Sequence, residues 1–392
     1  LDGDDVPDKK EVFLTGFGGH DHDHGVHSVV VGPDGRWYLA VGNAGPHVVT
    51  DKSGWTLRSG SIYRGGGENE ADNHPRLVSD DGRVWTGGLL LRCEPDGTKL
   101  TVMAHNFRNE YEVALDSFGN LFTADNDDDG SQGCRTAWVM EGGNYGYFSA
   151  DGSREWQADR RPGQDVWAAH WHQDDPGVCP AGCRNGAGGP TGVVVYEGDL
   201  LGAQWMGVVL DCDAGANCVY AHTPVAKGAG YEMKPGTLLR SKPKGEDDKA
   251  ARWFRPSDVC VGTDGSVFVA DWWDPGVGGH AAGDAEAYGR ILRVAPSGSR
   301  LHAPKIDLKT AQGQAEALKS PAVNVRALGF DALRAQGEKA LPTIEGLLGD
   351  LSPWIRARAA WLLARTGNAG HKRLLQEMKD AVMEMRAKPA RA

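Results

Sequence analysis

The sequence predicts an all-β propeller over residues 1–304, followed by a small all-α solenoid of HEAT-like helical repeats over residues 305–392. The propeller is predicted because strand–turn–strand units recur along the first part of the chain, with helix signals absent between them. The solenoid is predicted because the composition changes after Pro304. There, the sequence of residues 325–337 recurs at residues 355–367, and apolar side chains follow helical spacing.

Each repeated unit of the propeller region is a pair of apolar runs separated by a turn, such as the one at Asp34-Gly35. Inner strands of a propeller end toward its central channel, so we expect Asn43, Asn126 and Trp272 at corresponding strand ends. A further strand is expected over residues 11–17. The repeated units occupy residues 29–43, 77–88, 113–126 and 259–272, and a shorter motif from Gly to Arg occupies residues 60–64, 88–92 and 289–293.

The charge and composition exclude some classes of partner. The formal net charge is −11 and the pI is about 5.6, which argues against nucleic acid or an anionic membrane surface as the main partner. Apolar runs are too short to span a bilayer, so we expect a chain that does not itself cross the membrane. The first residue is Leu1, so we expect a processed chain or a fragment of a longer protein.

The chain has seven cysteines, four of which form two close pairs in sequence, Cys179 with Cys183 and Cys212 with Cys218. Both pairs are predicted to be short-loop disulfides, which would place the chain in the periplasm or another oxidising, exported location. The alternative is a zinc site built from the same four thiols, which their irregular spacing makes the weaker interpretation. No Cys-x-x-Cys-His motif is present, so a covalently attached haem is not expected.

A histidine-rich loop at residues 18–27 carries four His and two Asp. It is interpreted as a transition-metal site, as a catalytic His held by a carboxylate, or as an exposed polar loop. A long insertion at residues 148–190 contains His170 and His172, for which packing within the insertion is the favoured interpretation. Long ordered loops also tend to be functional.

An acidic loop follows the strand that ends at Ala124. Its four carboxylates, at Asp125, Asp127, Asp128 and Asp129, would repel one another in a dry site and are the oxygen ligands that calcium prefers. The alternative is a solvated surface loop. Residues 2–8 are a second candidate calcium loop, with a disordered acidic terminus as the alternative.

Several motifs together resemble one family. Asp23-His24 precedes Gly32-Pro33-Asp34, Arg108-Asn109 precedes a strand, and the acidic loop is followed by Gly-Gly-Asn-Tyr-Gly at residues 142–146. With residues 271–280 and Arg255, these motifs resemble the N-terminal propeller of planctomycete-type (PVC-type) membrane-bound dehydrogenases. Residues 309–392 resemble the HEAT repeats that follow that propeller. The propeller is similar to soluble glucose/sorbosone dehydrogenases, which are six-bladed and use pyrroloquinoline quinone and calcium. The resemblance implies a six-bladed propeller here, or one short of its first blade or two.

The resemblance also implies roles for individual residues. His24, oriented by Asp23, would be the catalytic base that takes the hydroxyl proton of a sugar or another alcohol. The quinone would be bound by Arg108, Asn109, Glu112, Asn126 and Arg255, and calcium by Asp125 and residues 127–129. Electrons would pass to an external acceptor such as a cytochrome c.

The chain departs from that family at two places that matter for a quinone. Ser257 replaces a second cofactor-binding arginine, and residues 210–213 lack a cofactor-contacting lysine. Both departures remove positive charge that an anionic tricarboxylate needs. Two alternatives therefore stay open: a non-catalytic, calcium-stabilised propeller that binds a glycan or protein partner, and a metallo-hydrolase of the lactonase type.

Overall fold

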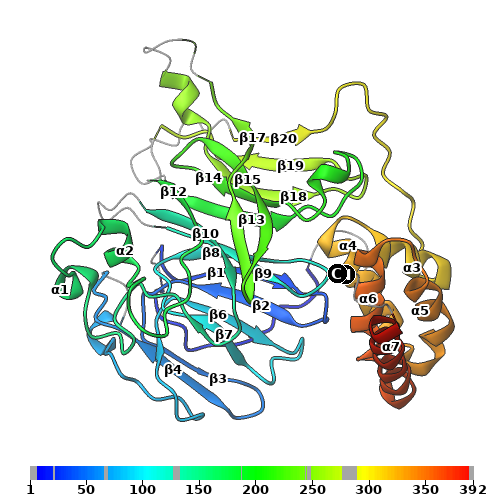
Figure 1. Cartoon of the computed structure of the whole chain (residues 1–392), viewed down its shortest axis with the longest axis horizontal. Helices are drawn as coiled ribbons and strands as arrows, with labels where there is room; N and C mark the ends of the chain where they lie inside the picture. The colour runs from blue at the N-terminus through cyan, green and yellow to red at the C-terminus, as the bar shows by residue number, and fades with distance from the viewer. Residues whose placement is uncertain are drawn as a thin grey trace. The chain divides into compact units, whose positions relative to one another are not determined.

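The structure, a computed structural model, consists of many strands in several sheets, followed by helices (Figure 1). It divides into two compact units. Unit 1 comprises residues 1–30, 37–113 and 123–188, and unit 2 comprises residues 31–36, 114–122 and 189–392. The residues that the structure describes are 7–20, 23–65, 69–126, 133–186, 188–242, 244, 249–275 and 289–387.

Most strands of the first half of the chain lie in three sheets with largely antiparallel pairing. In two of these sheets, buried Leu, Val, Trp and Cys side chains between residues 37 and 105 form one cluster. The first sheet has the order β1 (Val26–Val31), β2 (Trp37–Val41), β6 (Leu89–Cys93), β7 (Thr101–His105) and β11 (Gly143–Asn144). The second has the order β3 (His47–Thr50), β4 (Thr56–Gly60) and β5 (Trp85–Thr86), and the third β12 (Cys183–Gly186), β10 (Cys134–Val139), β9 (Leu121–Asp125) and β8 (Glu110–Leu115).

Unit 2 contains two further sheets, whose β-branched side chains and Leu210 form a second buried cluster. One sheet has the order β13 (Pro190–Val195), β14 (Val209–Asp213), β15 (Cys218–Lys227) and β16 (Gly230–Lys234), and β17 (Thr237–Arg240) also pairs with β15. The other has the order β18 (Pro256–Val261), β19 (Val267–Asp271) and β20 (Arg290–Val294).

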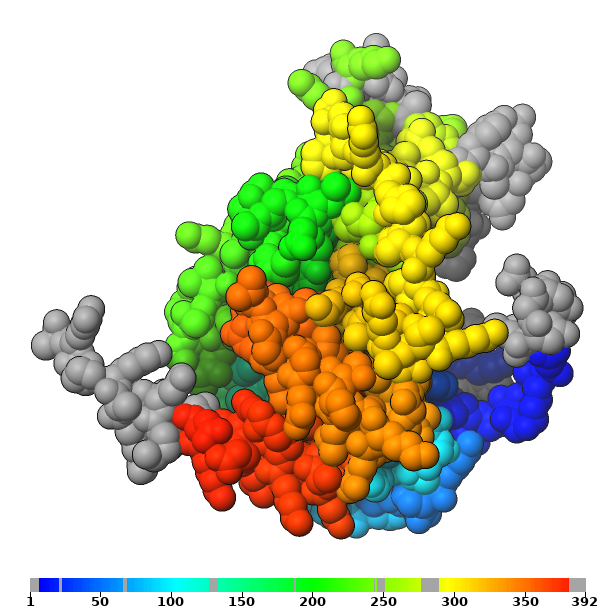
Figure 2. All heavy atoms as spheres, turned by 90° about the vertical axis from the view of Figure 1, so that its right-hand side faces the viewer, coloured from blue at the N-terminus to red at the C-terminus, as the bar shows by residue number. Residues whose placement is uncertain are grey.

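In the part of the chain that the structure describes, five α-helices follow the last strand, and Figure 2 shows their outer surface in yellow to red. Thr310 caps the first of them, because its side chain accepts a hydrogen bond from the Gly313 amide. Buried apolar side chains three or four residues apart, such as Phe330 with Leu333 and Ile344 with Leu347, form the helical core. The helices are α3 (Ala311–Lys319), α4 (Val323–Arg334), α5 (Leu341–Leu348), α6 (Pro353–Leu363) and α7 (Gly367–Ala387), with the 3-10 turn η5 (Gly337–Ala340) between α4 and α5.

The short helices of the chain lie in its loops. Within the described part of the chain, no helix is both long enough and apolar enough to span a lipid bilayer. The short elements are η1 (Glu70–Asp72), α1 (Trp156–Asp159), α2 (Val166–His170), η2 (Ala203–Trp205) and η3 (Lys249–Trp253).

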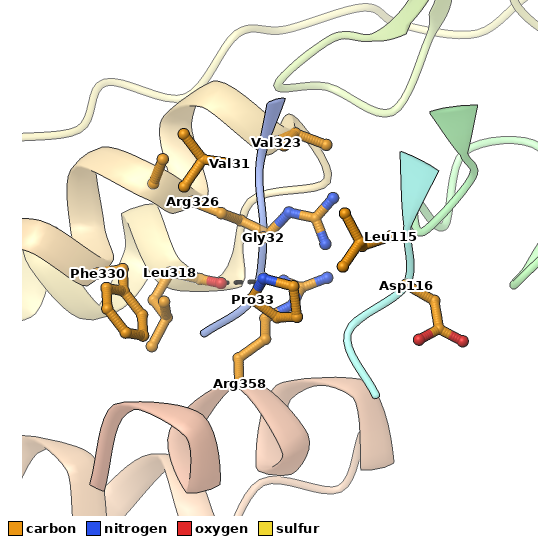
Figure 3. Close-up of a pocket in the computed structure, with 11 residues that line it drawn as sticks. Val31, Gly32, Pro33, Leu115, Asp116, Leu318, Val323, Arg326, Phe330 and Arg358 are labelled. Atoms are coloured by element: carbon orange, nitrogen blue, oxygen red, sulfur yellow. Dashed lines mark hydrogen bonds between the residues drawn. The ribbon is translucent and has the colours of Figure 1, made fainter. Parts of the chain in front are cut away.

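Within unit 2, the helices pack against turns of the β-structure through a buried charge cluster. Glu197 accepts hydrogen bonds from the amide and the hydroxyl of Ser117, both at 2.6 Å, and from Arg358 Nη2 at 2.7 Å. Arg326 Nη1 also donates to Glu197. Figure 3 shows Arg326 and Arg358 reaching from α4 and α6 toward Pro33 and Leu115, which line the same small cavity.

The turns that contact the helices are two of the predicted Asp-Gly type turns. Asp34 and Asp116 each accept a backbone N–H from two residues further along the chain. Gly35 has φ +72°, and a Cβ atom there would lie 2.3 Å from the Phe330 ring. Both the backbone conformation and the close approach of α4 therefore require glycine at this position.

The predicted hairpins are confirmed, since residues 29–43, 113–126 and 259–272 each contain two neighbouring strands of a sheet. The predicted strand at residues 11–17 is wrong. That segment has no strand pairing, although its Phe13 packs against the buried cluster of the first sheets. The six-bladed closure, the HEAT assignment and the boundary at residue 304 stay predictions.

The two predicted disulfides are wrong: Cys179 is not bonded to Cys183, nor Cys212 to Cys218, and the described residues contain no disulfide. In the β14–β15 ladder, Cys212 lies opposite Val219, while Cys218 lies opposite Asp213. Side chains alternate between the faces of a sheet, so the two thiols point to opposite faces. The two disulfides were the reason for expecting an oxidising compartment, so that reason no longer holds. An exported location stays a prediction.

Candidate functional site

The predicted catalytic base, His24, lies in the turn before β1 and is 4% exposed. Its Nδ1 is 2.7 Å from Asn43 Oδ1, and its ring stacks on Tyr63 with the centroids 5.2 Å apart. An amide oxygen only accepts, so Nδ1 carries the hydrogen and Nε2 is the basic atom of the ring. The hydrogen bond that orients His24 thus comes from Asn43, which the sequence marked only as a strand end.

The Arg-Asn motif lies beside this histidine in unit 1. The amide of Asn43 donates to the Arg108 carbonyl at 3.1 Å, and Asn109 Nδ2 donates to the Asp23 carbonyl at 3.1 Å. Asn109 Oδ1 also lies 2.7 Å from His27 Nε2. The structure therefore brings Asp23, His24, Arg108 and Asn109 together, with Asp23 joining through its main chain.

Two other predicted cofactor-binding residues lie near this group. Arg108 Nη1 donates to Asn126 Oδ1, and Asn126 Nδ2 donates to the Gly188 carbonyl at 3.3 Å. Glu112 is half-buried in β8, and its carbonyl accepts from the Thr123 hydroxyl at 2.7 Å. The roles of Asn126 and Glu112 in cofactor binding stay predictions.

Asp125, a predicted calcium ligand, is 1% exposed and is held by protein groups. Its carboxylate accepts hydrogen bonds from the amides of Arg108 and Asn109, and it forms an ion pair with Arg135 at 2.8 Å. Arg135 is itself fully buried, with its guanidinium 3.5 Å from the centroid of the Trp171 ring. This geometry favours a structural role for Asp125, which fixes the start of the Arg-Asn segment. Asp127, Asp128 and Asp129 lie outside the described residues, as do residues 2–6 of the second candidate calcium loop.

Sequence reasoning missed Glu110, which begins β8 and is fully buried. Neither of its carboxyl oxygens has a hydrogen-bond partner among the described residues. Burial, followed by the charge of Asp125, raises the pKa of Glu110 well above its usual value, which favours the neutral form of the side chain. No signal marked Glu110, because a glutamate in an alternating strand normally faces solvent.

Arg255, the predicted cofactor-binding arginine of unit 2, donates its side-chain hydrogen bonds to main-chain carbonyls. Its Nε donates to Asp274 at 2.9 Å, its Nη1 to Ala214 at 2.8 Å and its Nη2 to Pro275 at 3.0 Å. Its amide donates to the Asp271 carboxylate at 2.8 Å. The Arg255 side chain thus links two loop segments of unit 2, at residue 214 and at residues 274–275. The Asp271 carboxylate fixes the Arg255 segment in the way that the Asp125 carboxylate fixes the Arg108 segment of unit 1.

The histidine-rich loop is described at residues 18–20 and 23–27 only. Within these residues, no group of three side chains is arranged to hold a metal ion. His27 stacks on Tyr111 with the centroids 4.2 Å apart, and His24 stacks on Tyr63. Asp21 and His22 lie outside the described residues, so the interpretations of this loop as a transition-metal site, as a catalytic His and as an exposed polar loop stay predictions.

The chain belongs to the family described as Domain of unknown function (DUF7133), whose model matches residues 1–277. No curated protein matches the chain. Among solved structures, it is similar to a protein of Thermus thermophilus assigned as an oxidoreductase of the glucose dehydrogenase kind. The sequence identity is 17%, the match covers 69% of this chain and 65% of that one, and the TM-score is 0.43.

Two further solved structures are similar to the chain. The PQQ-bound aldose sugar dehydrogenase of Streptomyces coelicolor is 17% identical, with 69% of this chain and 79% of that one covered and a TM-score of 0.39. The soluble aldose sugar dehydrogenase of Escherichia coli, in its apo form, is 15% identical, with 69% and 63% covered and a TM-score of 0.40. The chain thus spans slightly less than two thirds of two of these three proteins. At this identity and TM-score, the likenesses carry no argument about activity.

The described residues do not fit pyrroloquinoline quinone as the resemblance implies it. A tricarboxylate needs several cations, but Arg255 is bonded to carbonyl groups, and β14 presents the buried carboxyls of Asp211 and Asp213 where a lysine was expected. Burial raises the pKa of Asp213. A carboxyl group is neutral or negative, so these two side chains supply none of the positive charge that a tricarboxylate needs. No reaction step is therefore derived through the quinone.

Proposed function

We propose that unit 1 binds a sugar or another alcohol and oxidises it, with His24 as the general base that accepts the hydroxyl proton. The orientation of the His24 ring carries this proposal: its Nδ1 lies 2.7 Å from Asn43 Oδ1 and Tyr63 covers one ring face, so the imidazole is held in one position beside Arg108 and Asn109. The class of reaction is oxidoreductase, and the electron acceptor is external.

Two neighbouring groups fit the oxygen atoms of such a substrate. Asn43 Nδ2 is buried without a hydrogen-bond partner among the described residues, so a substrate hydroxyl or carbonyl oxygen would satisfy it. Arg108 adds a positive charge to the same group of residues, which favours the negative charge that develops on the substrate oxygen during proton transfer. The oxidation also releases a hydride from the adjacent carbon, which an external two-electron acceptor of the quinone class has to receive; a cytochrome could then take the two electrons from that acceptor one at a time.

A second candidate function is a binding module without turnover. It is favoured by Asp125 and Arg255, which the resemblance assigns to calcium and quinone but which bond to protein groups in this chain. In that case the group around His24 would bind a glycan or a protein loop through hydrogen bonds, and calcium would stabilise loops only.

The test measures sugar binding and sugar oxidation separately. The purified chain is incubated with Ca²⁺, pyrroloquinoline quinone and a dye acceptor, and a panel of sugars and alcohols is assayed for turnover and, by calorimetry, for binding. We expect His24→Gln to lower turnover on the order of 10²-fold to 10⁴-fold while binding persists. The control is His20→Gln, an exposed histidine of the same loop, which should match the wild type.

The remaining outcomes separate the two candidates. Sugar binding without turnover, with or without the quinone, would support the binding module and overturn the dehydrogenase. Turnover that is equal in His24→Gln and the wild type would overturn the role of His24. An activity that requires added quinone would show that this chain binds it despite the bonded Arg255 and the carboxyls of β14.

A further inference from the structure

The insertion in unit 1 contains a second cluster of chemically active side chains. Asp159, His172 and Asp175 each offer one ligand atom, and these atoms lie within 4.8 Å of one another. We propose that these three side chains bind a divalent transition-metal ion of the zinc class. The site is separate from the two acidic loops and from the histidine-rich loop for which metal binding was considered in the sequence.

The geometry of His172 is the observation that points to a cation. The side chain is 3% exposed, and its Nδ1 donates to the Gly146 carbonyl at 2.7 Å. A carbonyl only accepts, so Nδ1 carries the hydrogen and Nε2 presents its lone pair on the other side of the ring. A hydrogen bond from the outer ring nitrogen to a backbone carbonyl is the arrangement that orients histidines for metal ligation.

His172 Nε2 faces a carboxylate oxygen that lacks a donor. It lies 3.4 Å from Asp159 Oδ2, and both atoms are buried without a hydrogen-bond partner among the described residues. Two lone pairs that face each other at this distance repel, unless a proton or a metal ion lies between them. A proton alone would give a charge-assisted hydrogen bond, for which 3.4 Å is long, since such bonds are about 2.7–2.9 Å. A bridging cation accounts for the separation better.

The two carboxylates are arranged for ligation as well. Arg154 Nε donates to Asp159 Oδ1 at 2.6 Å, and Arg161 Nη2 pairs with Asp175 Oδ1. Each arginine therefore holds one carboxylate oxygen, and the second oxygen is the one available to the site.

The local fold places the three ligands at the ends of two short helices. Asp159 is the last residue of α1, and His172 follows the end of α2, which lies beside α1 (Figure 1). The amide of Asp175 donates to the His172 carbonyl at 2.9 Å, so a tight turn brings the third ligand back. Asp159 and Asp175 are half-buried, which leaves one side of the site open to a water molecule or a substrate oxygen.

The set of ligands selects the class of metal. One imidazole nitrogen with two carboxylate oxygens suits zinc or manganese, whereas calcium and magnesium prefer oxygen ligands alone. Zinc is bound at about 2.0–2.2 Å by both ligand types.

The test uses Zn²⁺ and Co²⁺ with the whole 392-residue chain after chelator treatment. Zn²⁺ affinity and stoichiometry are measured by calorimetry, and Co²⁺ supplies a visible absorption spectrum that reports nitrogen and oxygen ligation. We expect Asp175→Asn to weaken Zn²⁺ binding at this site by at least about 10-fold and to change the Co²⁺ spectrum. The matched control is Asp174→Asn, which removes an exposed neighbouring carboxylate bonded to Gln164 and should change the affinity less than about twofold.

Other sites in the chain can also take up Zn²⁺, so the result rests on the difference between the two variants. Equal affinity, stoichiometry and Co²⁺ spectra in the wild type, Asp175→Asn and Asp159→Asn would overturn the proposal. A wild type that takes up no Zn²⁺ would overturn it as well. Circular dichroism shows whether each variant is folded, and Asp175→Asn, on a half-buried side chain, keeps the test decisive if His172→Gln does not fold. The result does not depend on sugar oxidation.

Discussion

Two buried glutamates, one in each unit, differ in the groups that surround a carboxyl removed from water. Glu197 in unit 2 is surrounded by donors: the amide and hydroxyl of Ser117 and the guanidinium groups of Arg326 and Arg358. Glu110 in unit 1 is equally buried, but neither of its oxygens has a hydrogen-bond partner among the described residues. One carboxyl is therefore kept ionised by its partners, and the other is kept neutral by its surroundings.

The pKa values of the two groups move in opposite directions for this reason. Burial alone would raise the pKa of Glu197, but the charges of Arg326 and Arg358 and the hydrogen bonds of Ser117 outweigh it and lower the pKa. Burial and the charge of Asp125 raise the pKa of Glu110. A buried carboxyl thus stabilises a fold only where its partners are buried with it, and the Glu197 cluster joins the helices to the β-turns of unit 2 in this way.

The largest expected effect is the loss of the Glu197 charge. Glu197→Gln leaves two arginines without their counter-charge, one of them the buried Arg358, whose pKa burial already lowers to about 10. We expect the free energy of unfolding of unit 2 to fall by about 3–5 kcal/mol at pH 7. Chemical denaturation measures the total loss. Hydrogen exchange of the α4 and α6 amides, relative to those of unit 1, shows whether the loss is local.

A double variant provides the control for this prediction. Glu197→Gln combined with Arg358→Met removes a buried charge together with its main partner, so the double variant should be more stable than Glu197→Gln alone. Glu197 stabilises the fold above the pKa of an unfolded glutamate, about 4.3, and this contribution is lost as the pH falls through the lowered pKa. An equal loss of stability at pH 7 and at pH 3 would contradict the assignment of an ionised Glu197.

Glu110→Gln is expected to change the free energy of unfolding by less than Glu197→Gln does, and to raise it instead of lowering it. Below about pH 4 the carboxyl is protonated in both the folded and the unfolded chain, so the substitution should be nearly neutral. As the pH rises, the unfolded chain ionises first, so the wild type loses about 1.4 kcal/mol for each unit by which the folded pKa is raised. Glutamine does not titrate, so Glu110→Gln should be more stable than the wild type at pH 7.

The measurement for Glu110 is a pair of denaturation series from pH 4 to pH 8, one for each protein. The difference in the free energy of unfolding should grow with pH and level off above the folded pKa. A difference that stays constant over this range would show that Glu110 does not titrate between the two states. The control is Glu112→Gln, two residues further along the same strand and half-buried, which should follow the wild type.

The sequence predicted local features better than long-range ones, and these two clusters show why. The hairpin at residues 113–126 was predictable because the Asp116 turn depends on residues within four positions. The neighbourhood of His24 and Arg108 was expected only through resemblance. Glu197 lies 80 residues from Ser117 and 161 residues from Arg358 in the chain, so no local pattern could join them.

The sequence repeat in the C-terminal region predicted helices correctly, but it did not predict the roles of the individual residues that it aligns. The repeat aligns Arg358 with Leu328, yet Arg358 is buried and binds Glu197, whereas Leu328 is 53% exposed. Asp125 was read as a calcium ligand because it belongs to an acidic run. Its partner Arg135 sits in β10, where an arginine normally faces solvent. A side chain's role depended in each case on which distant residue was buried with it.

The smallest change in the free energy of unfolding is expected for a glutamate that forms an ion pair on the exposed surface. Glu232 in β16 pairs with Lys227 in β15 at 3.0 Å, and the two side chains are 61% and 70% exposed. Water solvates both charges in the folded and the unfolded chain, so Glu232→Gln should change the free energy of unfolding by less than about 0.5 kcal/mol. Denaturation at low and at high salt checks this value, since an exposed pair is screened by salt and the Glu197 cluster is not. A loss for Glu232→Gln as large as that for Glu197→Gln would mean that pairing, and not burial of the partners, sets the stabilisation.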